Sequence, residues 1–291
     1  MNVLDQTVTD RFSLYHGDCV DVLRGLPDRS VDYSVFSPPF ASLYTYSNSP
    51  RDMGNVKNDA EFFAHFGFLV SEMARVMRTG RLVSFHCMLM PTSKERDGYI
   101  GLRDFRGDLI RAFQAHGFIY HSEVVIWKDP VTAMQRTKAL GLLHKTVREN
   151  GSMSRQGIPD YVVTMRAPGD PENRVKHDND SLPVSLWQRY ASPVWMDIDP
   201  SDTLQHRSAR EHDDERHICP LQLEVIRRCV RLWTNPGDVV LSPYTGIGSE
   251  GYVALQEGRR FVGAELKTSY YQQAARNLAE ACNGKQADLF A

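Results

Sequence analysis

Short apolar runs alternate with segments of helical periodicity along most of the chain. The apolar runs are rich in β-branched and aromatic residues and cover residues 11–17, 31–37, 81–87, 122–128, 238–244 and 259–267. Between them, residues such as Phe105, Leu109 and Phe113 recur at the spacing of one helix face. Strands that alternate with helices in this way are typical of a parallel sheet covered on both faces. The pattern therefore predicts an α/β fold with a mostly parallel sheet.

The predicted helices cover residues 18–26, 59–77, 103–117, 220–233 and 269–282, and a further helix follows a glycine-containing turn after residue 244. Gly80 and Gly117 are expected to end two of these helices, because glycine readily adopts the left-handed conformation found just past a helix. Residues 41–58 show no periodicity and are predicted to form a surface loop.

The alternation of strands and helices breaks between residues 131 and 200. This stretch holds one strand-like run at 160–166 and then a segment rich in Pro, Asp and Asn. Such a composition predicts loops in place of regular elements. We therefore divide the chain into residues 1–130, an insert or small subdomain at 131–200, and residues 201–291.

Composition is that of an ordinary globular protein. Of the 291 residues, 42% are hydrophobic and 24% charged, which allows a sizeable core. No apolar run reaches the length of a membrane span, and the first twelve residues lack the features of a signal peptide. The five cysteines are scattered, and neither they nor the ten histidines have metal-ligand spacing. We expect a cytoplasmic protein with reduced thiols, no metal and no membrane partner.

Charge is distributed unevenly along the chain. The net charge is −2, so the whole molecule is not a basic binder of polyanions. Within residues 131–156, however, a single acid, Glu149, opposes five basic residues, which are Arg136, Lys138, Lys145, Arg148 and Arg155. A local basic excess is what binding to a phosphate backbone requires. A solvated surface loop would have the same composition, so both interpretations stay open at this point.

A glycine turn lies between a predicted strand and a predicted helix. It has the pattern Gly246-x-Gly248-x-x-Gly251, and Glu265 ends the next predicted strand. Glycines let a nucleotide approach the backbone, and a terminal acid accepts hydrogen bonds from ribose hydroxyls. A dinucleotide and S-adenosylmethionine both fit this description, as does a plain tight turn beside an exposed glutamate. Dehydrogenases normally begin with such a unit, so its place in the last quarter of the chain favours S-adenosylmethionine.

The apolar run 31–37 ends in Ser37-Pro38-Pro39-Phe40. The planar amine of a nucleobase is a poor nucleophile, and two hydrogen-bond acceptors draw its nitrogen toward tetrahedral geometry. Ser37 Oγ and the Pro38 carbonyl are candidate acceptors. Pro39 would be a rigid brace, and Phe40 a surface on which a base outside the duplex stacks. Alternatively, the prolines only end a strand and Phe40 packs into the core.

Several blocks of the sequence resemble the β-group DNA amino-methyltransferases, which methylate N4 of cytosine or N6 of adenine. Residues 17–40 are similar to the family block that ends in Asp, Ser or Asn followed by Pro-Pro-Tyr or Pro-Pro-Phe. Residues 123–130 are similar to its strand ending in Trp-Lys, and residues 194–198 and 217–251 to its later half. The order of the blocks is the circularly permuted order of that group.

The resemblance implies a Rossmann-like methyltransferase fold. Its mostly parallel, seven-stranded sheet would be assembled from both ends of the chain and covered by helices on both faces. Residues 1–130 would form the catalytic half, 131–200 a small target-recognition insert, and 201–291 the half that binds the cofactor, S-adenosylmethionine. Double-stranded DNA would be the partner, and the resemblance leaves a homodimer open. A bacterial or phage origin is expected.

The resemblance also assigns roles to individual residues. The catalytic residues would be Ser37, Pro38, Pro39 and Phe40. The cofactor would contact Asp18, Cys19, His217, Pro220, Ser242, Pro243, Tyr244, Thr245, Gly246, Gly248, Glu265 and Leu266. DNA would contact Tyr44, Trp127, Lys128, Arg136, Lys138, Lys145, Arg148 and Arg155. For Trp127 the alternative is a core aromatic at a strand end, and for Lys128 a solvent-facing cation.

Ser37 is the first residue of the Ser-Pro-Pro-Phe tip that ends the predicted strand. A serine there favours N4 of cytosine as the methylated atom, because the family's adenine enzymes typically have Asp at this position; N6 of adenine is the second choice. Two departures from the family pattern stand out. Ser242-Pro243-Tyr244 replaces Asp-Pro-Phe before the glycine turn, and Asp160-Tyr161 replaces His-Glu. A nicotinamide-dependent oxidoreductase and an inactive DNA-binding relative are the competing hypotheses.

Overall fold

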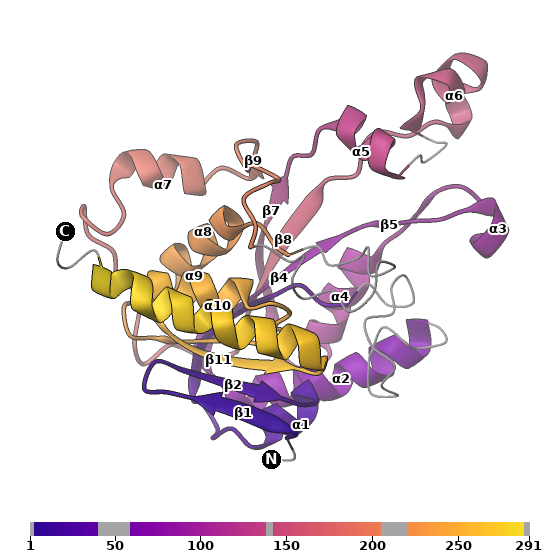
Figure 1. Cartoon of the computed structure of the whole chain (residues 1–291). Coiled ribbons are helices and arrows are strands. Elements are labelled where there is room, and N and C mark those ends of the chain that lie inside the picture. The colour runs from indigo at the N-terminus through magenta and orange to yellow at the C-terminus, as the bar shows by residue number, and fades with distance from the viewer. Residues whose placement is uncertain (1–2, 40–58, 138–141, 205–219, 288–291) are drawn as a thin grey trace.

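The computed structural model describes residues 3–39, 59–137, 142–204 and 220–287 (Figure 1). A nine-stranded sheet runs through this part of the chain. Its spatial order is β1 (Asp5–Val8), β2 (Phe12–His16), β11 (Arg260–Glu265), β10 (Val239–Ser242), β3 (Val31–Phe36), β4 (Met77–Met88), β8 (Asp160–Arg166), β7 (Ile119–Ile126) and β9 (Val194–Trp195).

The sheet is mostly parallel, as predicted. The four pairings that connect β2, β11, β10, β3 and β4 are all parallel, whereas β8 is antiparallel to both of its neighbours. The predicted number of seven strands was wrong, because β1 and β9 extend the two edges. These strands have four and two residues, too short for a clear alternation in the sequence.

The centre of the sheet joins the two ends of the chain. Strand β10 lies between β11 and β3, with Val240 opposite Tyr33 and Leu241 opposite Ser34. The Ser34 hydroxyl donates a hydrogen bond of 2.9 Å to the Leu241 carbonyl. Elements more than 200 positions apart therefore form one rigid unit.

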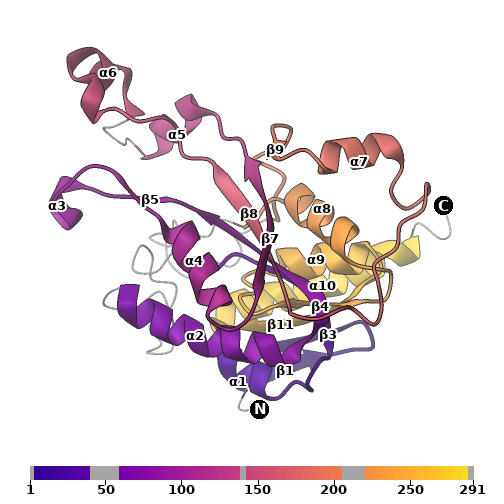
Figure 2. The same ribbon diagram turned by 180° about the vertical axis from the view of Figure 1, so that it is seen from behind.

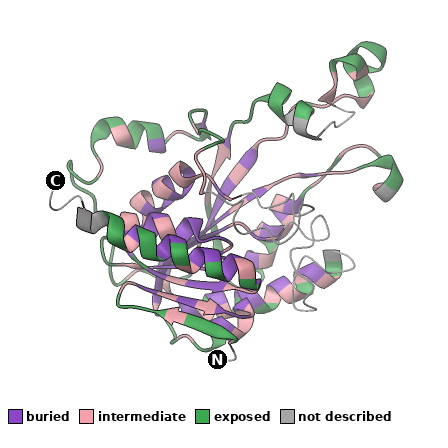
Figure 3. Cartoon of the chain, viewed as in Figure 1, coloured by how far each residue is buried: buried purple, intermediate pink, exposed green. Residues whose placement is uncertain are grey.

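Helices cover both faces of the sheet. On one face lie α1 (Cys19–Arg24), α2 (Asp59–Val76) and α4 (Phe105–Gln114), and on the other α8 (Leu223–Trp233), α9 (Ser249–Gln256) and α10 (Thr268–Ala287). Phe36 packs into the first core and Tyr33 into the second. Every residue of β3 is buried, as a strand between two helical layers requires. Buried residues are concentrated in the sheet and in the helices that cover it (Figure 3).

Gly80 does not end a helix, contrary to the prediction. Helix α2 ends at Val76, and Gly80 lies within β4 with a φ of 69°. A Cβ atom on Gly80 would lie 2.6 Å from Pro171 Cδ and 2.8 Å from the Gly169 carbonyl oxygen. The glycine is needed because another segment of backbone approaches closely, a requirement that no local pattern reveals.

The predicted insert does not form a unit separate from the sheet. Residues 160–166 form β8, which lies between β4 and β7 in the main sheet. Strand β9 adds to the edge of the same sheet, and α7 (Val184–Tyr190) precedes it. An isolated strand-like run carries no information about its partner, so the sequence could not place it.

Two excursions leave the sheet on the same side (Figures 1 and 2). Residues 128–159, here called the arm, connect β7 to β8 and hold α5 (Pro130–Thr137), α6 (His144–Glu149) and a 3-10 helix (Gly151–Met153). The second excursion follows β4 and comprises β5 (Met90–Pro91), α3 (Lys94–Asp97) and β6 (Leu102–Arg103). Within the described ranges, no helix combines the length and the apolar character that a bilayer crossing demands.

Candidate functional site

The carboxyl ends of the parallel strands meet at one edge of the sheet. Ser37 follows β3, the glycine turn follows β10, and Glu265 ends β11. The Gly17 amide donates a hydrogen bond of 2.9 Å to the Glu265 carbonyl, which brings Asp18 to the same edge. In open α/β sheets, ligands bind beyond the carboxyl ends of the strands. Ser37 and the predicted cofactor residues Asp18, Gly246 and Glu265 therefore lie on one edge.

The three glycines of the turn serve different purposes. A Cβ atom on Gly246, whose φ is 54°, would meet nothing within 4 Å. Cβ atoms on Gly248 and Gly251 would instead lie 3.3 Å from Ala274 Cα and 2.5 Å from Leu278 Cδ2, both on α10. Gly246 thus faces open space, whereas the other two glycines allow α10 to pack closely.

Glu265 holds the turn through both carboxylate oxygens. Oε2 accepts a hydrogen bond of 2.8 Å from the Gly246 amide, and Oε1 accepts one of 2.8 Å from the Lys267 amide. The side chain is half-buried. Charged acceptors form the stronger hydrogen bonds, so this carboxylate fixes the backbone of the turn at its open point.

Ser242 presents a buried hydroxyl beside the turn. The residue is fully buried, and its Oγ atom has no hydrogen-bond partner among the described residues. The Thr245 hydroxyl donates to the Ser242 carbonyl over 3.1 Å, so the backbone of this strand end is satisfied. A buried hydroxyl without a partner costs about 1–3 kcal/mol, which a ligand group at this place would relieve.

Cys19 and Tyr244 connect the turn with the catalytic strand. Tyr244 forms a hydrogen bond with the buried Cys19 thiol, whose pKa is raised above its usual range by burial. The Tyr244 ring also lies 5.8 Å from the ring of Phe36, the residue before Ser37. Asp18 caps α1, accepting hydrogen bonds of 2.9 and 3.1 Å from the Val20 and Asp21 amides.

Ser37 contacts a polar cluster that sequence analysis missed. Its Oγ atom lies 3.2 Å from Nδ1 of His86 on β4. The other ring nitrogen, Nε2, lies 3.0 Å from Oδ2 of Asp160, the first residue of β8. Lys128 Nζ lies 2.6 Å from the same oxygen. The available signal was a histidine near the end of the predicted strand 81–87, but nothing in the sequence placed that strand beside Ser37.

Asp160 is ionised despite its burial. Burial raises the pKa of this carboxyl, but the neighbouring His86 and Lys128 side chains outweigh burial and bring the pKa below its usual value. Lys128, predicted to contact DNA, is thus paired with a buried carboxylate at the base of the arm. Pro38 is buried and Pro39 half-buried beside this cluster.

Other predicted residues are distributed over the edge and the arm. Trp127 is 45% exposed, so the alternative of a core aromatic was wrong. Lys145 and Arg148 are exposed on α6, and Arg155 is half-buried. His16 Nε2 lies 3.1 Å from the Leu266 carbonyl, and Pro220 is half-buried just before α8. Outside the described residues lie Phe40, Tyr44, Lys138 and His217; for Arg136, in α5, only the backbone is described.

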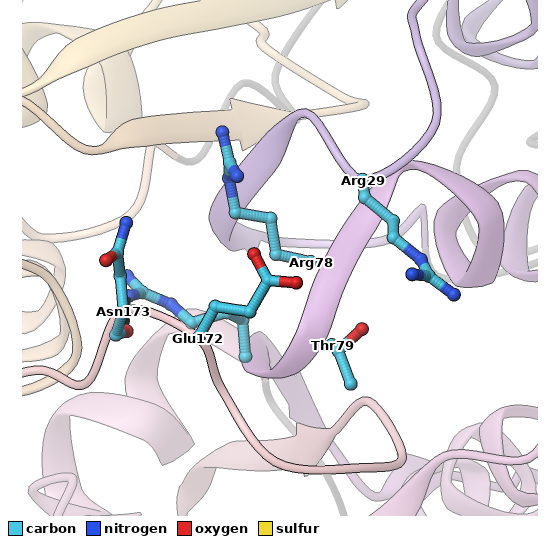
Figure 4. A pocket seen from close by; sticks show the side chains of 6 residues that line it. Arg29, Arg78, Thr79, Glu172 and Asn173 are labelled. Carbon is cyan, nitrogen blue, oxygen red and sulfur yellow. Dashed lines mark hydrogen bonds between the residues drawn. The ribbon is translucent and has the colours of Figure 1, made fainter.

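A pocket at the opposite edge of the sheet is structural in character. It is lined by Arg29, Arg78, Thr79, Arg81, Glu172 and Asn173 (Figure 4). Arg81 donates hydrogen bonds of 2.9 Å to the carbonyls of Asp32 and Asn173 and pairs with Asp238. These contacts join β3, β4 and β10 at their amino ends, far along the strands from Ser37. Among the residues that the structure describes, no group of three or more His, Cys, Asp or Glu could hold a metal ion.

Glu250, in the first turn of α9, is protonated near neutral pH. Burial, with a smaller contribution from the charge of Glu265, raises its pKa to about 8, although a hydrogen bond from its own backbone lowers it. Between the ordinary pKa of 4.5 and 8, the folded chain keeps a proton that the unfolded chain releases. Stability is therefore lost as the pH rises through this window.

We expect Glu250→Gln to remove this loss, because glutamine ionises in neither state. The difference in melting temperature, variant minus wild type, should be larger at pH 8.5 than at pH 5 by at least about 3 °C. For a chain of this size, that change corresponds to roughly 1 kcal/mol of unfolding free energy. Differential scanning fluorimetry measures it, with Glu280→Gln on the exposed face of α10 as control. An equal difference at both pH values would contradict the raised pKa.

Comparison with known families identifies the class of protein. A family model described as DNA methylase, of the N6/N4 type, matches residues 31–276. This span includes β3 and its tip, the arm, the glycine turn and the first turns of α10 up to residue 276. The chain therefore belongs to this family and is a DNA amino-methyltransferase.

Relatives in sequence agree with this assignment. The type II methyltransferase M.Cfr9I of Citrobacter freundii is 26% identical over 297 residues, covering 91% of this chain and 87% of that protein. The type II methyltransferase M.BglII of Bacillus subtilis is 24% identical, covering 91% and 68%. The DNA adenine methyltransferase YhdJ of Escherichia coli K12 is 23% identical, covering 91% and 82%.

Solved structures share the fold. The putative DNA modification methylase TTHA0409 of Thermus thermophilus, solved with S-adenosylmethionine, has a TM-score of 0.69 at 23% identity, covering 94% of this chain and 97% of that one. The cytosine-N4-specific PvuII DNA methyltransferase has a TM-score of 0.69 at 17% identity, covering 97% and 95%. The Rossmann-like methyltransferase fold is thus confirmed, whereas the circular permutation stays a prediction.

Proposed function

We propose that this protein methylates the exocyclic N4 amine of cytosine in double-stranded DNA, on a base turned out of the helix. The observation that carries the proposal is the position of the Ser37 hydroxyl. It lies at the end of β3, next to the strand that leads into the glycine turn, and the ring of Tyr244 packs against its neighbour Phe36. A bacterial or phage-infected cytoplasm, where DNA is accessible, is the matching location.

The methyl donor is S-adenosylmethionine, which supplies an electrophilic methyl group on a positively charged sulfur. The residues of the turn fit it. Gly246 leaves open space, Ser242 offers a partnerless buried hydroxyl, and Glu265 has a half-buried carboxylate for ribose hydroxyls. Because Ser242 carries a hydroxyl in place of the carboxylate common in the family and Glu250 is protonated, Glu265 and Asp18 are the carboxylates left to face the cofactor at neutral pH.

In this proposal, two acceptors hold the amine of the target base. Ser37 Oγ accepts a hydrogen bond from one N–H group, and the Pro38 carbonyl accepts one from the other. As the nitrogen gains positive charge during methyl transfer, both oxygens stabilise it, and their fixed positions avoid the cost of reorganisation. Pro38 and Pro39 restrict the backbone, so the carbonyl keeps its direction.

Adenine N6 is the second candidate target. Its amine has the same two N–H groups and could be held by the same two oxygens. One relative, YhdJ, is named a DNA adenine methyltransferase. Serine at position 37 favours cytosine through the family association described above.

Incubation of the protein with plasmid DNA and S-adenosylmethionine that carries an isotopically labelled methyl group distinguishes the two bases. After digestion to nucleosides, mass spectrometry should find the label in N4-methylcytosine. Label found in N6-methyladenine would show that adenine, and not cytosine, is the target base. Absence of label from every base, with cofactor binding intact, would support an inactive DNA-binding relative.

We further propose that the arm contacts the DNA backbone and contributes to recognition of the target sequence. The arm projects from the edge of the sheet that carries Ser37 (Figure 1). Its exposed basic side chains include Lys145 and Arg148. The ion pair of Lys145 with Glu149 spans 3.7 Å between exposed side chains and is therefore weak. The side chains of Lys145 and Arg148 can therefore bind DNA phosphates at little energetic cost.

Reversal of the two charges in Lys145→Glu/Arg148→Glu should weaken DNA binding about 10- to 100-fold near 0.1 M salt. The slope of log K against log salt concentration should become shallower by about 2, one unit for each lost phosphate contact. Fluorescence anisotropy with a labelled duplex measures both. The matched control, Arg174→Glu/Lys176→Glu, makes the same change in charge at the opposite edge of the sheet. Equal losses in the two variants would indicate a general field effect in place of contact by the arm.

A further inference from the structure

The cluster beside Ser37 forms a continuous chain of polar atoms across three strands. Ser37 Oγ lies 3.2 Å from His86 Nδ1, and His86 Nε2 lies 3.0 Å from Asp160 Oδ2. The strands are adjacent in the order β3, β4, β8. Residues 37, 86 and 160 thus meet at one point of the sheet edge, although none of them is near another in the sequence.

The series of polar side chains ends inside the protein, at Asp160. Asp160 is 4% exposed, and its Oδ1 atom has no hydrogen-bond partner among the described residues. Its charge is therefore balanced through Oδ2, which both His86 and Lys128 approach. A buried charge is retained only where such partners are fixed in place, so the geometry of His86 is set by an element that cannot easily relax.

The Asp160 carboxylate decides which nitrogen of His86 holds the proton. Nε2 lies 3.0 Å from this anion, in a contact outside hydrogen-bond geometry. The field of the carboxylate favours a proton on Nε2, so that Nδ1 keeps its lone pair. Nδ1 then accepts the Ser37 hydroxyl proton. With that proton turned toward His86, the lone pairs of Ser37 Oγ are free to accept a hydrogen bond from another group.

We propose that Asp160 and His86 act as a relay that turns the Ser37 hydroxyl into a directed acceptor for the amine of the target base, and that His86 receives the proton released on methylation. This inference rests on the function proposed above. It gives a physical reason why a neutral serine can serve at a position where relatives use an aspartate. His86 and Asp160 are positioning residues that act through Ser37.

The proton step balances as follows. The amine nitrogen uses its lone pair to bond the methyl carbon, and the carbon–sulfur bond breaks with its electron pair remaining on sulfur. The nitrogen, now positively charged, gives one proton to Ser37 Oγ, while Ser37 gives its own proton to His86 Nδ1. His86 becomes an imidazolium beside the Asp160 carboxylate and later releases the proton to water. Positioned acids and bases of this kind typically accelerate reactions about 10²- to 10⁴-fold.

A double-mutant cycle tests whether His86 acts through Ser37. His86→Ala should lower the single-turnover rate of methyl transfer about 10- to 100-fold, within the range for a positioned base. It should leave the dissociation constants for S-adenosylmethionine and DNA within about twofold. In the Ser37→Ala background, the same change should alter the rate less than about twofold, since coupled residues are not additive. If His86→Ala lowered the rate by the same factor in the wild-type and the Ser37→Ala proteins, the relay would be overturned.

The tautomer of His86 provides a test that is independent of activity. In a ¹⁵N-labelled sample of the full chain, long-range ¹⁵N–¹H correlation should show the proton of His86 on Nε2, with the signal assigned by its absence in His86→Ala. In Asp160→Asn this preference should weaken. A proton on Nδ1 in the wild-type protein would contradict the relay.

Two further variants keep the test decisive. His86→Asn keeps an acceptor oxygen near the position of Nδ1 but takes up no proton, so its rate should lie between those of wild type and His86→Ala. If His86→Ala does not fold, the coupling to Ser37 is measured with His86→Asn. His121→Ala on the exposed start of β7 is the matched control and should leave the rate unchanged. If the wild-type protein transfers no methyl group to DNA, the proposed function fails, and if Ser37→Ala is fully active, the role of Ser37 as an acceptor fails. If Ser37→Ala is inactive but His86 shows no coupling to it, the relay alone fails.

Discussion

Ser37→Ala is expected to lower the rate of methyl transfer by at least about 100-fold, because it removes a positioned acceptor from a reaction in which the attacking nitrogen becomes positive. The Ser37 hydroxyl lies at the carboxyl edge of the sheet, 3.2 Å from His86. Alanine preserves the backbone of the tip but leaves one N–H group of the amine without its acceptor. The nitrogen then stays planar and unreactive.

Single-turnover kinetics with prebound S-adenosylmethionine and saturating DNA separates this loss from binding. Affinity for the cofactor should be unchanged, since the Ser37 side chain points to His86 and not to the glycine turn. Ser30→Ala is the matched control, because Ser30 lies at the other end of the same strand, bonded to the Pro27 carbonyl. A Ser37→Ala enzyme with wild-type rates would exclude Ser37 as an acceptor.

Glu265→Gln is expected to raise the dissociation constant for S-adenosylmethionine about 10- to 100-fold, the equivalent of one charged hydrogen bond. Both carboxylate oxygens accept backbone hydrogen bonds, from Gly246 and Lys267. A glutamine has only one acceptor oxygen, so its NH₂ group would face an amide N–H. The turn loses its open conformation at Gly246, and the ribose hydroxyls lose an anionic acceptor.

Isothermal titration calorimetry measures this affinity, with Glu280→Gln as a control that removes one negative charge from the exposed face of α10. Because Glu265 lies at the surface edge of the sheet, the variant should remain folded, which far-UV circular dichroism verifies. An unchanged dissociation constant would remove Glu265 from the cofactor site.

The parts of the fold that sequence analysis predicted correctly are those with strong local patterns. Strand β3 and helix α4 lie within the predicted ranges, because an unbroken apolar run and a helical face are each complete within one element. The glycine turn and Glu265 were also recognisable, since strand, turn, helix and strand follow one another directly. The edge strands β1 and β9 were missed because they are short and lie in polar surroundings.

Other features depended on contacts between distant segments. Gly80 and Gly117 look equivalent in the sequence, yet Gly117 follows α4 in a left-handed conformation while Gly80 lies inside β4 against residues 169–171. Lys128 was predicted to contact DNA, which stays a prediction, and the structure adds that its ammonium group pairs with Asp160. In both cases the deciding neighbour lies more than 30 positions away, beyond the reach of any local pattern.

By itself, the sequence determined the candidate groups for the chemistry of this protein: a proline-braced serine, a glycine turn and a terminal acid are local motifs, and each is formed by residues that adjoin one another. Only the tertiary structure decided which of these groups lie close together. The order β10, β3, β4, β8 brings the turn, Ser37, His86 and Asp160 to one edge. The physical reason is that strand order is set by packing of two helical layers on the sheet, which no short stretch of residues encodes.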